Sequence, residues 1–118
     1  MGAVHIEILD SYFLHEKKAS AGFVHQLAVY FSARVQERLV LARSLLIEGQ
    51  RESVGDHLHA LKNAFLNVGA LDAADDCQEL ENQVGRLSTG EILSRLNGLE
   101  CSSVQIQNEL RDIISSRS

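Results

Sequence analysis

The sequence predicts an all-α protein, an antiparallel up-and-down four-helix bundle with a short additional N-terminal helix. Apolar residues recur at steps of three and four almost throughout the 118 residues, which is the period of an amphipathic helix and not of a strand. The chain has no Pro, no Trp, two Tyr and four Phe, so it lacks the turns and strand formers of a sandwich or barrel. Its length fits a single domain over residues 1–118.

The N-terminal part contains a short helical segment and a long one. A short helix is expected over about 4–18, with Ile6, Leu9 and Phe13 on one face. This face would pack against the rest of the chain. The second helix is expected over about 21–48. Its predicted inward residues are Phe23, Leu27, Phe31, Val35, Leu39, Ala42 and Leu46.

The third and fourth helices are each followed by a glycine. The third helix is expected over 51–68 and the fourth over 71–84. Gly49, Gly69 and Gly85 stand just after the second, third and fourth helices, where a C-terminus favours a left-handed residue. The predicted inward residues are Val54, Leu58, Leu61, Phe65 and Val68 on the third helix, then Ala73, Cys77, Leu80 and Val84 on the fourth.

The last helix opens with a capping box. Ser88 and Glu91 have the Ser-x-x-Glu spacing, so the helix is expected to begin near Thr89 and to run to about Ile114, with 115–118 frayed. Its inward positions have a seven-residue rhythm and are Ile92, Leu96, Leu99, Ser103, Ile106, Leu110 and Ile113. Such a rhythm more often builds the core of one chain, although homodimerisation through this helix is an alternative. The short loops make consecutive helices antiparallel.

Charge and length exclude several classes of partner. Eleven basic and sixteen acidic residues give a net charge of −5, and no basic cluster exists beyond Lys17-Lys18, so nucleic acid is not an expected partner. No apolar run approaches the roughly 20 residues that span a bilayer, and no signal-peptide pattern opens the chain. We therefore expect a cytoplasmic protein without membrane insertion.

Motifs for metal, nucleotide or redox chemistry are missing from the sequence. The chain has no Glu-x-x-His pair of the kind that builds metal sites in bundles, and no Gly-rich phosphate-binding or kinase motif. Cys77 and Cys101 lack the CxxC spacing, so we expect two buried or partly buried free thiols.

His59 lies opposite the apolar stripe of the third helix and is expected to face water. Lys62, one turn later, is placed where its ammonium can reach an anion carried by the imidazole. Gly55 lies one turn earlier, and since an interior Gly costs about 1 kcal/mol relative to Ala, it indicates that bulk is unwelcome beside His59. From spacing alone, an ordinary solvated face is the alternative.

Further residues around His59 form a longer pattern. His59-Ala60-Leu61-Lys62-Asn63-Ala64, then Gly69-Ala70, then Cys77-x-x-Leu80-Glu81 follow without a gap in spacing. This pattern resembles the signature of histidine-containing phosphotransfer (Hpt) domains, which implies a four-helix bundle with the phosphorylated histidine exposed in mid-helix. The chain departs from that signature at Asn63, where the family usually has Gly, and at Phe65, where a small residue is usual. Phe65 is expected to alter only packing, whereas the Asn63 side chain would crowd a docking partner or donate to the phosphoryl group instead.

The resemblance implies a phosphotransfer intermediate of a two-component phosphorelay, without independent turnover. His59 would accept a phosphoryl group from a receiver-domain aspartate and pass it to another receiver, with Lys62 stabilising the phosphoryl oxygens. The docking surface would consist of Gly55, Asp56, Asn63 and Leu66. The implied partners are response-regulator receiver domains and a hybrid sensor kinase. The chain would need no cofactor of its own, since the receiver would bring Mg²⁺.

The alternative function is a non-catalytic docking or regulatory bundle. Such a module would bind a receiver or kinase without accepting phosphate, and Asn63 is the residue that keeps this reading open.

Overall fold

The computed structural model describes residues 3–5, 7–8 and 20–117. These residues contain no strand, and their four helices are α2 (Ala21–Ile47), α3 (Arg51–Asn67), α4 (Leu71–Gln83) and α5 (Thr89–Arg117). The prediction of an all-α bundle is confirmed, and the four helices begin where the sequence indicated. The short helix expected over 4–18, with Ile6, Leu9 and Phe13, falls largely outside the described residues.

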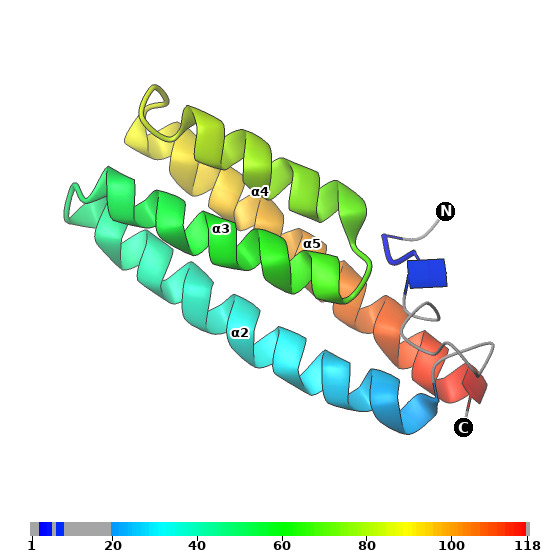
Figure 1. Cartoon of the computed structure of the whole chain (residues 1–118). Coiled ribbons are helices and arrows are strands. Elements are labelled where there is room, and N and C mark those ends of the chain that lie inside the picture. The colour runs from blue at the N-terminus through cyan, green and yellow to red at the C-terminus, as the bar shows by residue number, and fades with distance from the viewer. Residues whose placement is uncertain (1–2, 6, 9–19, 118) are drawn as a thin grey trace.

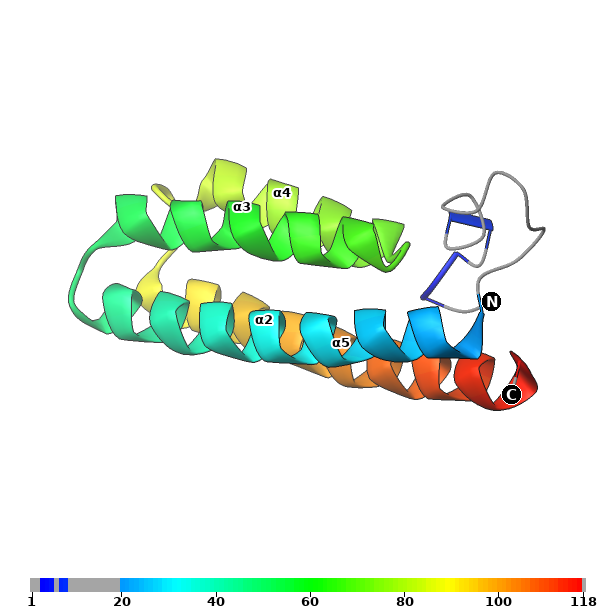
Figure 2. The same ribbon diagram turned by 60° about the horizontal axis from the view of Figure 1, so that its bottom comes forward.

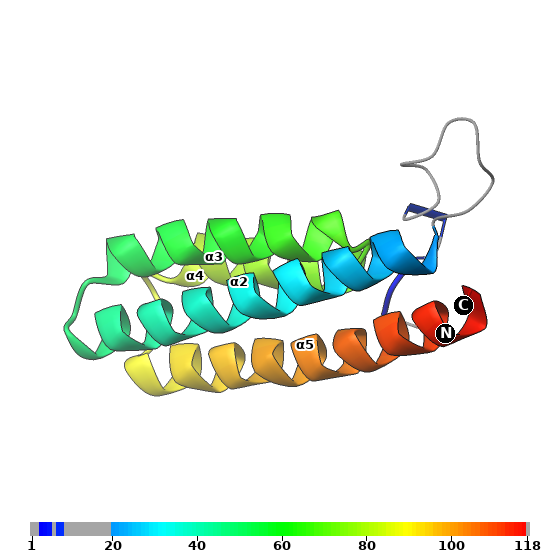
Figure 3. The same cartoon turned by 90° about the horizontal axis from the view of Figure 1, so that it is seen from below.

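The helices pack in chain order around one axis, and α5 closes the bundle against α2 (Figure 1). Figure 2 shows α3 and α4 as one layer over α2 and α5, and Figure 3 places α2 between α3 and α5. The longest extent is 47 Å, close to the roughly 43 Å of a helix as long as α5 at about 1.5 Å per residue. The longer α2 and α5 overrun the α3–α4 hairpin at the end where the chain begins (Figure 2).

The core consists of the predicted stripes, with a shift near the start of α2 and with Val84, at the C-cap of α4, only half-buried. Phe31 and Phe65 are fully buried, and their ring centroids lie 5.5 Å apart in an edge-to-face arrangement, so Phe65 is a packing residue as expected. Phe23 and Leu27 are only half-buried, and Val24 is buried instead. Val24 lies two turns before Phe31 and keeps the phase of the buried row, whereas Phe23 and Leu27 lie to one side of it.

The seven predicted inward residues of α5 are all buried within the bundle. The one polar member, Ser103, donates its hydroxyl to the carbonyl oxygen of Glu100 at 2.7 Å, so its burial leaves no unsatisfied hydroxyl. Because this row packs inside a single chain, it does not offer the surface that homodimerisation through this helix would need.

The ends of α5 match one prediction and contradict another. In the capping box, the Ser88 amide donates to Glu91 Oε1 at 3.3 Å and the Glu91 amide donates to Ser88 Oγ at 3.1 Å. Hydrogen bonding of the Glu91 carboxyl with the Ser88 side chain, and with the Ser88 backbone amide, lowers the pKa of that carboxyl. The expected end near Ile114 is wrong, because α5 continues to Arg117 and the Ser116 hydroxyl donates to the carbonyl oxygen of Ile113 at 2.9 Å.

Side-chain and backbone contacts fasten the connections between helices. Arg51, at the start of α3, donates to the carbonyl oxygens of Val84, at 2.9 Å, and of Leu87 in the α4–α5 connection. At the opposite end, the amides of Ala3 and Val4 donate to the Glu109 carboxylate of α5 at 2.8 and 3.0 Å. Residues 3 and 4 are thereby held against α5.

Two glycines adopt the left-handed conformation that the sequence indicated. Gly49 has φ +79° and Gly69 has φ +74°, whereas Gly85 has no positive φ and lies two residues beyond the end of α4. The carbonyl oxygen of Gly69 accepts a hydrogen bond from the His5 amide at 2.8 Å. A Cβ at Gly69 would lie 2.8 Å from the His5 carbonyl oxygen, whereas a Cβ at Gly49 would meet nothing within 4 Å.

Gly49→Ala and Gly69→Ala therefore form a matched pair that separates backbone strain from steric contact. We expect Gly49→Ala to lower the free energy of unfolding by about 1 kcal/mol, the cost of a left-handed alanine. Gly69→Ala should lower it by clearly more, because it adds the contact with His5. Urea denaturation of both variants measures the difference, and equal losses would contradict close packing of residues 3–5 on the α3–α4 connection.

Candidate functional site

His59 stands at the midpoint of α3, with 59% of its side chain exposed. The opposite side of the helix carries the fully buried Val54, Leu58, Leu61 and Phe65. Burial of this row leaves His59 no orientation other than outward. The predicted exposure of His59 is therefore confirmed.

A carboxylate from the neighbouring helix faces the imidazole. His59 Nδ1 lies 3.6 Å from Oε1 of Glu81 on α4. This oxygen is buried and has no hydrogen-bond partner among the described residues, so a small movement toward Nδ1–H would satisfy it. With Nδ1 directed at Glu81, Nε2 is the ring nitrogen left for chemistry. The sequence resemblance included Glu81, but the analysis of spacing did not single it out as a site residue.

Lys62 lies on the α4 side of His59. Its Nζ donates to Gln78 Oε1 at 2.8 Å, and Gln78 Nε2 in turn donates to Asn82 Oδ1 at 3.0 Å. The half-buried Lys62 is therefore tethered to α4 one turn after the histidine.

The other predicted site residues separate into two groups. Asp56 and Asn63 are exposed, whereas Gly55 and Leu66 are half-buried, with Leu66 packed against the core. Leu66 is thus less exposed than its helical phase indicated. A Cβ at Gly55 would lie 4.0 Å from the Glu81 side chain, which is an ordinary contact. The expectation that bulk is unwelcome there therefore applies to larger side chains and not to alanine.

We use the name exposed strip for Glu52, Asp56, His59 and Asn63 of α3.

His57 has a different environment from His59, although only one residue separates them. Its Nδ1 lies 3.0 Å from Arg38 Nη1 of α2. Because a guanidinium only donates, Nδ1 of His57 must accept this hydrogen bond. His57 is half-buried and bound to α2, which makes it a natural comparison for His59.

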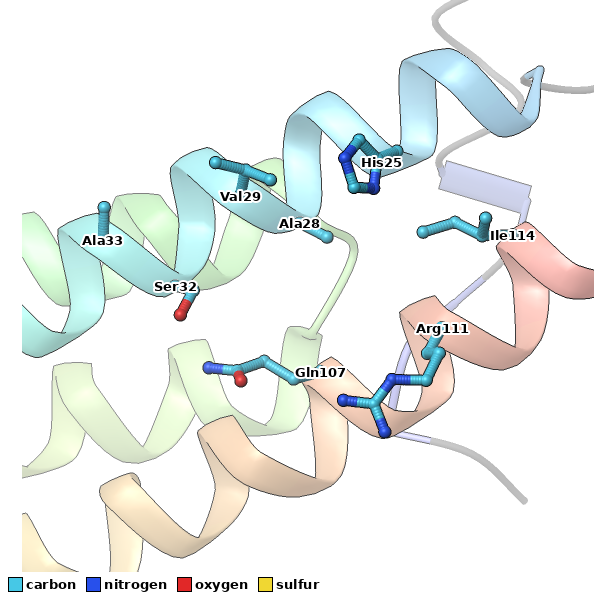
Figure 4. Close-up of a pocket in the computed structure, with 8 residues that line it drawn as sticks. All are labelled: His25, Ala28, Val29, Ser32, Ala33, Gln107, Arg111 and Ile114. Carbon is cyan, nitrogen blue, oxygen red and sulfur yellow. The ribbon is translucent and has the colours of Figure 1, made fainter.

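Two hollows flank α2. The smaller, about 180 Å³, lies between α2 and α3 beside the exposed strip. The larger, about 560 Å³, lies between α2 and α5, and Figure 4 shows Ser32 and Gln107 extending into it. None of the predicted site residues lines the larger hollow, so volume alone does not locate the site. Among the described residues, no group of three or more His, Cys, Asp or Glu could hold a metal ion.

The two cysteines are both free but differ in exposure. Cys77 is buried, and this burial, together with the charges of Asp76 and Glu81, raises the pKa of its thiol to about 12. Cys101 is exposed, contrary to the expectation that both thiols are at least partly buried. Cys101 lies on the outer side of α5, where the inward phase belongs to Leu99 and Ser103.

The comparison with family models decides which group of proteins this fold and site belong to. The model of the Hpt domain matches residues 26–116, which include α3, α4 and His59. The chain belongs to the Hpt domain family. Hpt domains carry out histidine phosphotransfer in phosphorelays and interact with receiver domains.

Two further findings concern this Hpt domain as a whole. Comparisons with curated proteins and with solved structures give no significant match. In the part of the chain that the structure describes, no helix combines the length and the apolar character needed to cross a membrane.

The thiols of this Hpt domain should react at different rates. With a thiol reagent at mildly alkaline pH, the native protein should lose one free thiol quickly, and that thiol should be absent in Cys101→Ser. Cys77 should react only after denaturation, since its thiolate is disfavoured and buried. Rapid modification of both thiols in the folded protein would contradict the close packing of α4 on α3.

Proposed function

We propose that Nε2 of His59 accepts the phosphoryl group from the aspartyl phosphate of a receiver domain and passes it to the aspartate of another receiver. The observation that carries this proposal is the exposed imidazole of α3, whose Nδ1 faces a buried Glu81 oxygen that has no hydrogen-bond partner among the described residues. The family supports phosphotransfer in general, and this geometry supports His59 as the acceptor.

The transfer can be written with all bonds accounted for. The Nε2 lone pair of neutral His59 attacks phosphorus, and the bond between phosphorus and the aspartate oxygen breaks, returning its electron pair to the receiver's carboxylate. The product is a phosphoimidazolium that keeps its proton on Nδ1. The Glu81 carboxylate, 3.6 Å away, stabilises this positive charge. Transfer to the next receiver is the same step in reverse.

Lys62 is proposed to stabilise the phosphoryl oxygens once they are attached to His59. Its tether to Gln78 holds the ammonium one turn from the imidazole, and exchange of this neutral hydrogen bond for a charged one favours contact with the phosphoryl group. Mg²⁺ is expected on the receiver, where it would neutralise charge on the transferring group.

The receiver is proposed to dock on the exposed strip. Asp56 and Asn63 would meet the partner directly, and Gly55 and Leu66 would lie at its α4 edge. A hybrid sensor kinase is the proposed source of the donor receiver. A cytoplasmic location is part of this proposal, because two free thiols fit a reducing compartment.

His59→Gln and His57→Gln test the acceptor directly. Incubation with a phosphorylated receiver and Mg²⁺ should label the wild-type chain with phosphate that survives alkali and is lost in acid. His59→Gln should take up no label and keep its helical circular dichroism, whereas His57→Gln should still be labelled. Label that persists in His59→Gln would contradict the assignment, and receiver binding without any label in the wild type would favour the docking-module alternative.

Glu81→Ala tests the role of the facing carboxylate. We expect the rate of transfer to His59 to fall about tenfold, equivalent to about 1.4 kcal/mol in the barrier, because the phosphoimidazolium loses its counter-charge. Glu81→Gln, which keeps an oxygen near Nδ1 without the charge, should lie between Ala and wild type. Rapid-quench kinetics measure these rates, and an unchanged rate in Glu81→Ala would remove Glu81 from the mechanism.

A further inference from the structure

The smaller hollow beside the exposed strip has a cationic wall. We call it the arginine hollow; α2 contributes Tyr30, Arg34 and Arg38 to its lining, and α3 contributes Ala60, Asn63, Ala64 and Asn67. The side chains of Ala60 and Ala64 are too small to fill the hollow. Asn63, one turn after His59, belongs both to the lining of the hollow and to the exposed strip. No Asp or Glu is among the residues that line it.

The two guanidinium groups have hydrogen-bonding capacity to spare. Arg34 Nη2 donates to the Tyr30 hydroxyl at 2.9 Å, and its Nη1 lies 3.8 Å from Glu37, a long ion pair at the surface. Arg38 donates from Nη1 to His57. Its Nε also has no acceptor among the described residues, but it is buried, so a partner could meet only the terminal nitrogens. Because a guanidinium carries five N–H donors, the pair can accommodate a further anionic acceptor.

The charge around His59 is otherwise unfavourable for an acidic partner. The chain has a net charge of −5, and the exposed strip itself contains Glu52 and Asp56. Lys62 is held on the opposite, α4 side. The arginine hollow therefore provides the positive charge on the α2 side of the strip.

We propose that the arginine hollow receives a carboxylate side chain of the docking receiver domain and thereby sets the affinity and orientation of docking, not the rate of the chemical step. This inference rests on the proposed function of His59. The receiver must carry the reacting aspartate and further carboxylates that hold Mg²⁺, so the face that it presents is acidic. The planar fork of Arg binds a carboxylate in a bidentate way.

The size of the hollow agrees with this occupant. Sites for small organic ligands usually enclose about 300 Å³ or more, and the arginine hollow encloses about 180 Å³. It has room for one side chain that enters from a docked surface. Complementary charge of this kind chiefly changes the encounter and the affinity of two proteins.

Arg34→Glu tests the proposal, with Arg111→Glu as the matched control. Arg111 is an exposed residue of α5, so its substitution changes the net charge equally at a distance from the exposed strip. Transfer from a phosphorylated receiver is measured over a range of receiver concentrations at low and high salt. We expect Arg34→Glu to raise the half-saturating receiver concentration at least tenfold at low salt, with a plateau rate within twofold of wild type. The difference should shrink at high salt, and Arg111→Glu should match wild type.

A small donor separates docking from chemistry. Phosphoramidate, which needs no docking surface, should label His59 equally in wild type, Arg34→Glu and Arg111→Glu. A lower plateau or weaker phosphoramidate labelling in Arg34→Glu would overturn the proposal, because the arginine would then act on the chemistry. Equal saturation curves for Arg34→Glu and Arg111→Glu would also overturn it.

Direct binding keeps this test independent of the proposed function. Titration calorimetry with an unphosphorylated receiver should show at least tenfold weaker binding for Arg34→Glu than for Arg111→Glu. This result can be obtained even if neither donor labels His59, in which case the phosphotransfer role fails and the docking role stands. Unaltered binding, with labelling of His59 intact, would overturn the docking role alone.

Discussion

Val54, Leu58, Leu61 and Phe65 bury one row of α3 completely, and the position of His59 depends on that burial. Each such side chain contributes about 1.5–3 kcal/mol when it leaves water, so the helix is held firmly in one rotation. A turn of the helix by one residue would expose part of this row and carry the imidazole toward the core. The orientation of His59 is thus a result of packing, and no contact to the ring itself is needed to keep it outward.

His59 lies between two unlike electrostatic surroundings. On the α4 side, the Glu81 carboxylate faces Nδ1, and Lys62 is bound to Gln78. On the α2 side, Arg38 is bound to His57 and borders a hollow without acidic residues. In the proposed transfer, the first side would suit the charge that develops on the ring, and the second the charge of an approaching partner. Chemistry and recognition would then depend on different neighbouring helices.

The features that could be predicted from the sequence are those that depend on the spacing of apolar residues along a helix and on interactions between residues close together in the chain. The phase of α3, the capping box of Ser88 and the left-handed Gly49 and Gly69 all follow from residues close together in the chain, and the structure confirms them. Contacts between helices could not be predicted in this way, because the distance from Glu81 to the imidazole depends on how α4 packs on α3. The half-burial of Leu66 was missed for the same reason, since helical phase alone does not show where a neighbouring helix covers the edge of a face.

The small side chains of α4 control more than packing. Ala73, Ala74 and Cys77 are its buried residues beside Leu80, and small side chains of this kind allow packed helices to approach closely. Glu81 lies on this same helix and reaches to 3.6 Å from the His59 imidazole across the contact between α3 and α4. The separation of two helix axes therefore governs how strongly a carboxylate acts on the imidazole. A substitution at these buried alanines would therefore change the surroundings of the His59 imidazole without altering any residue of the exposed strip.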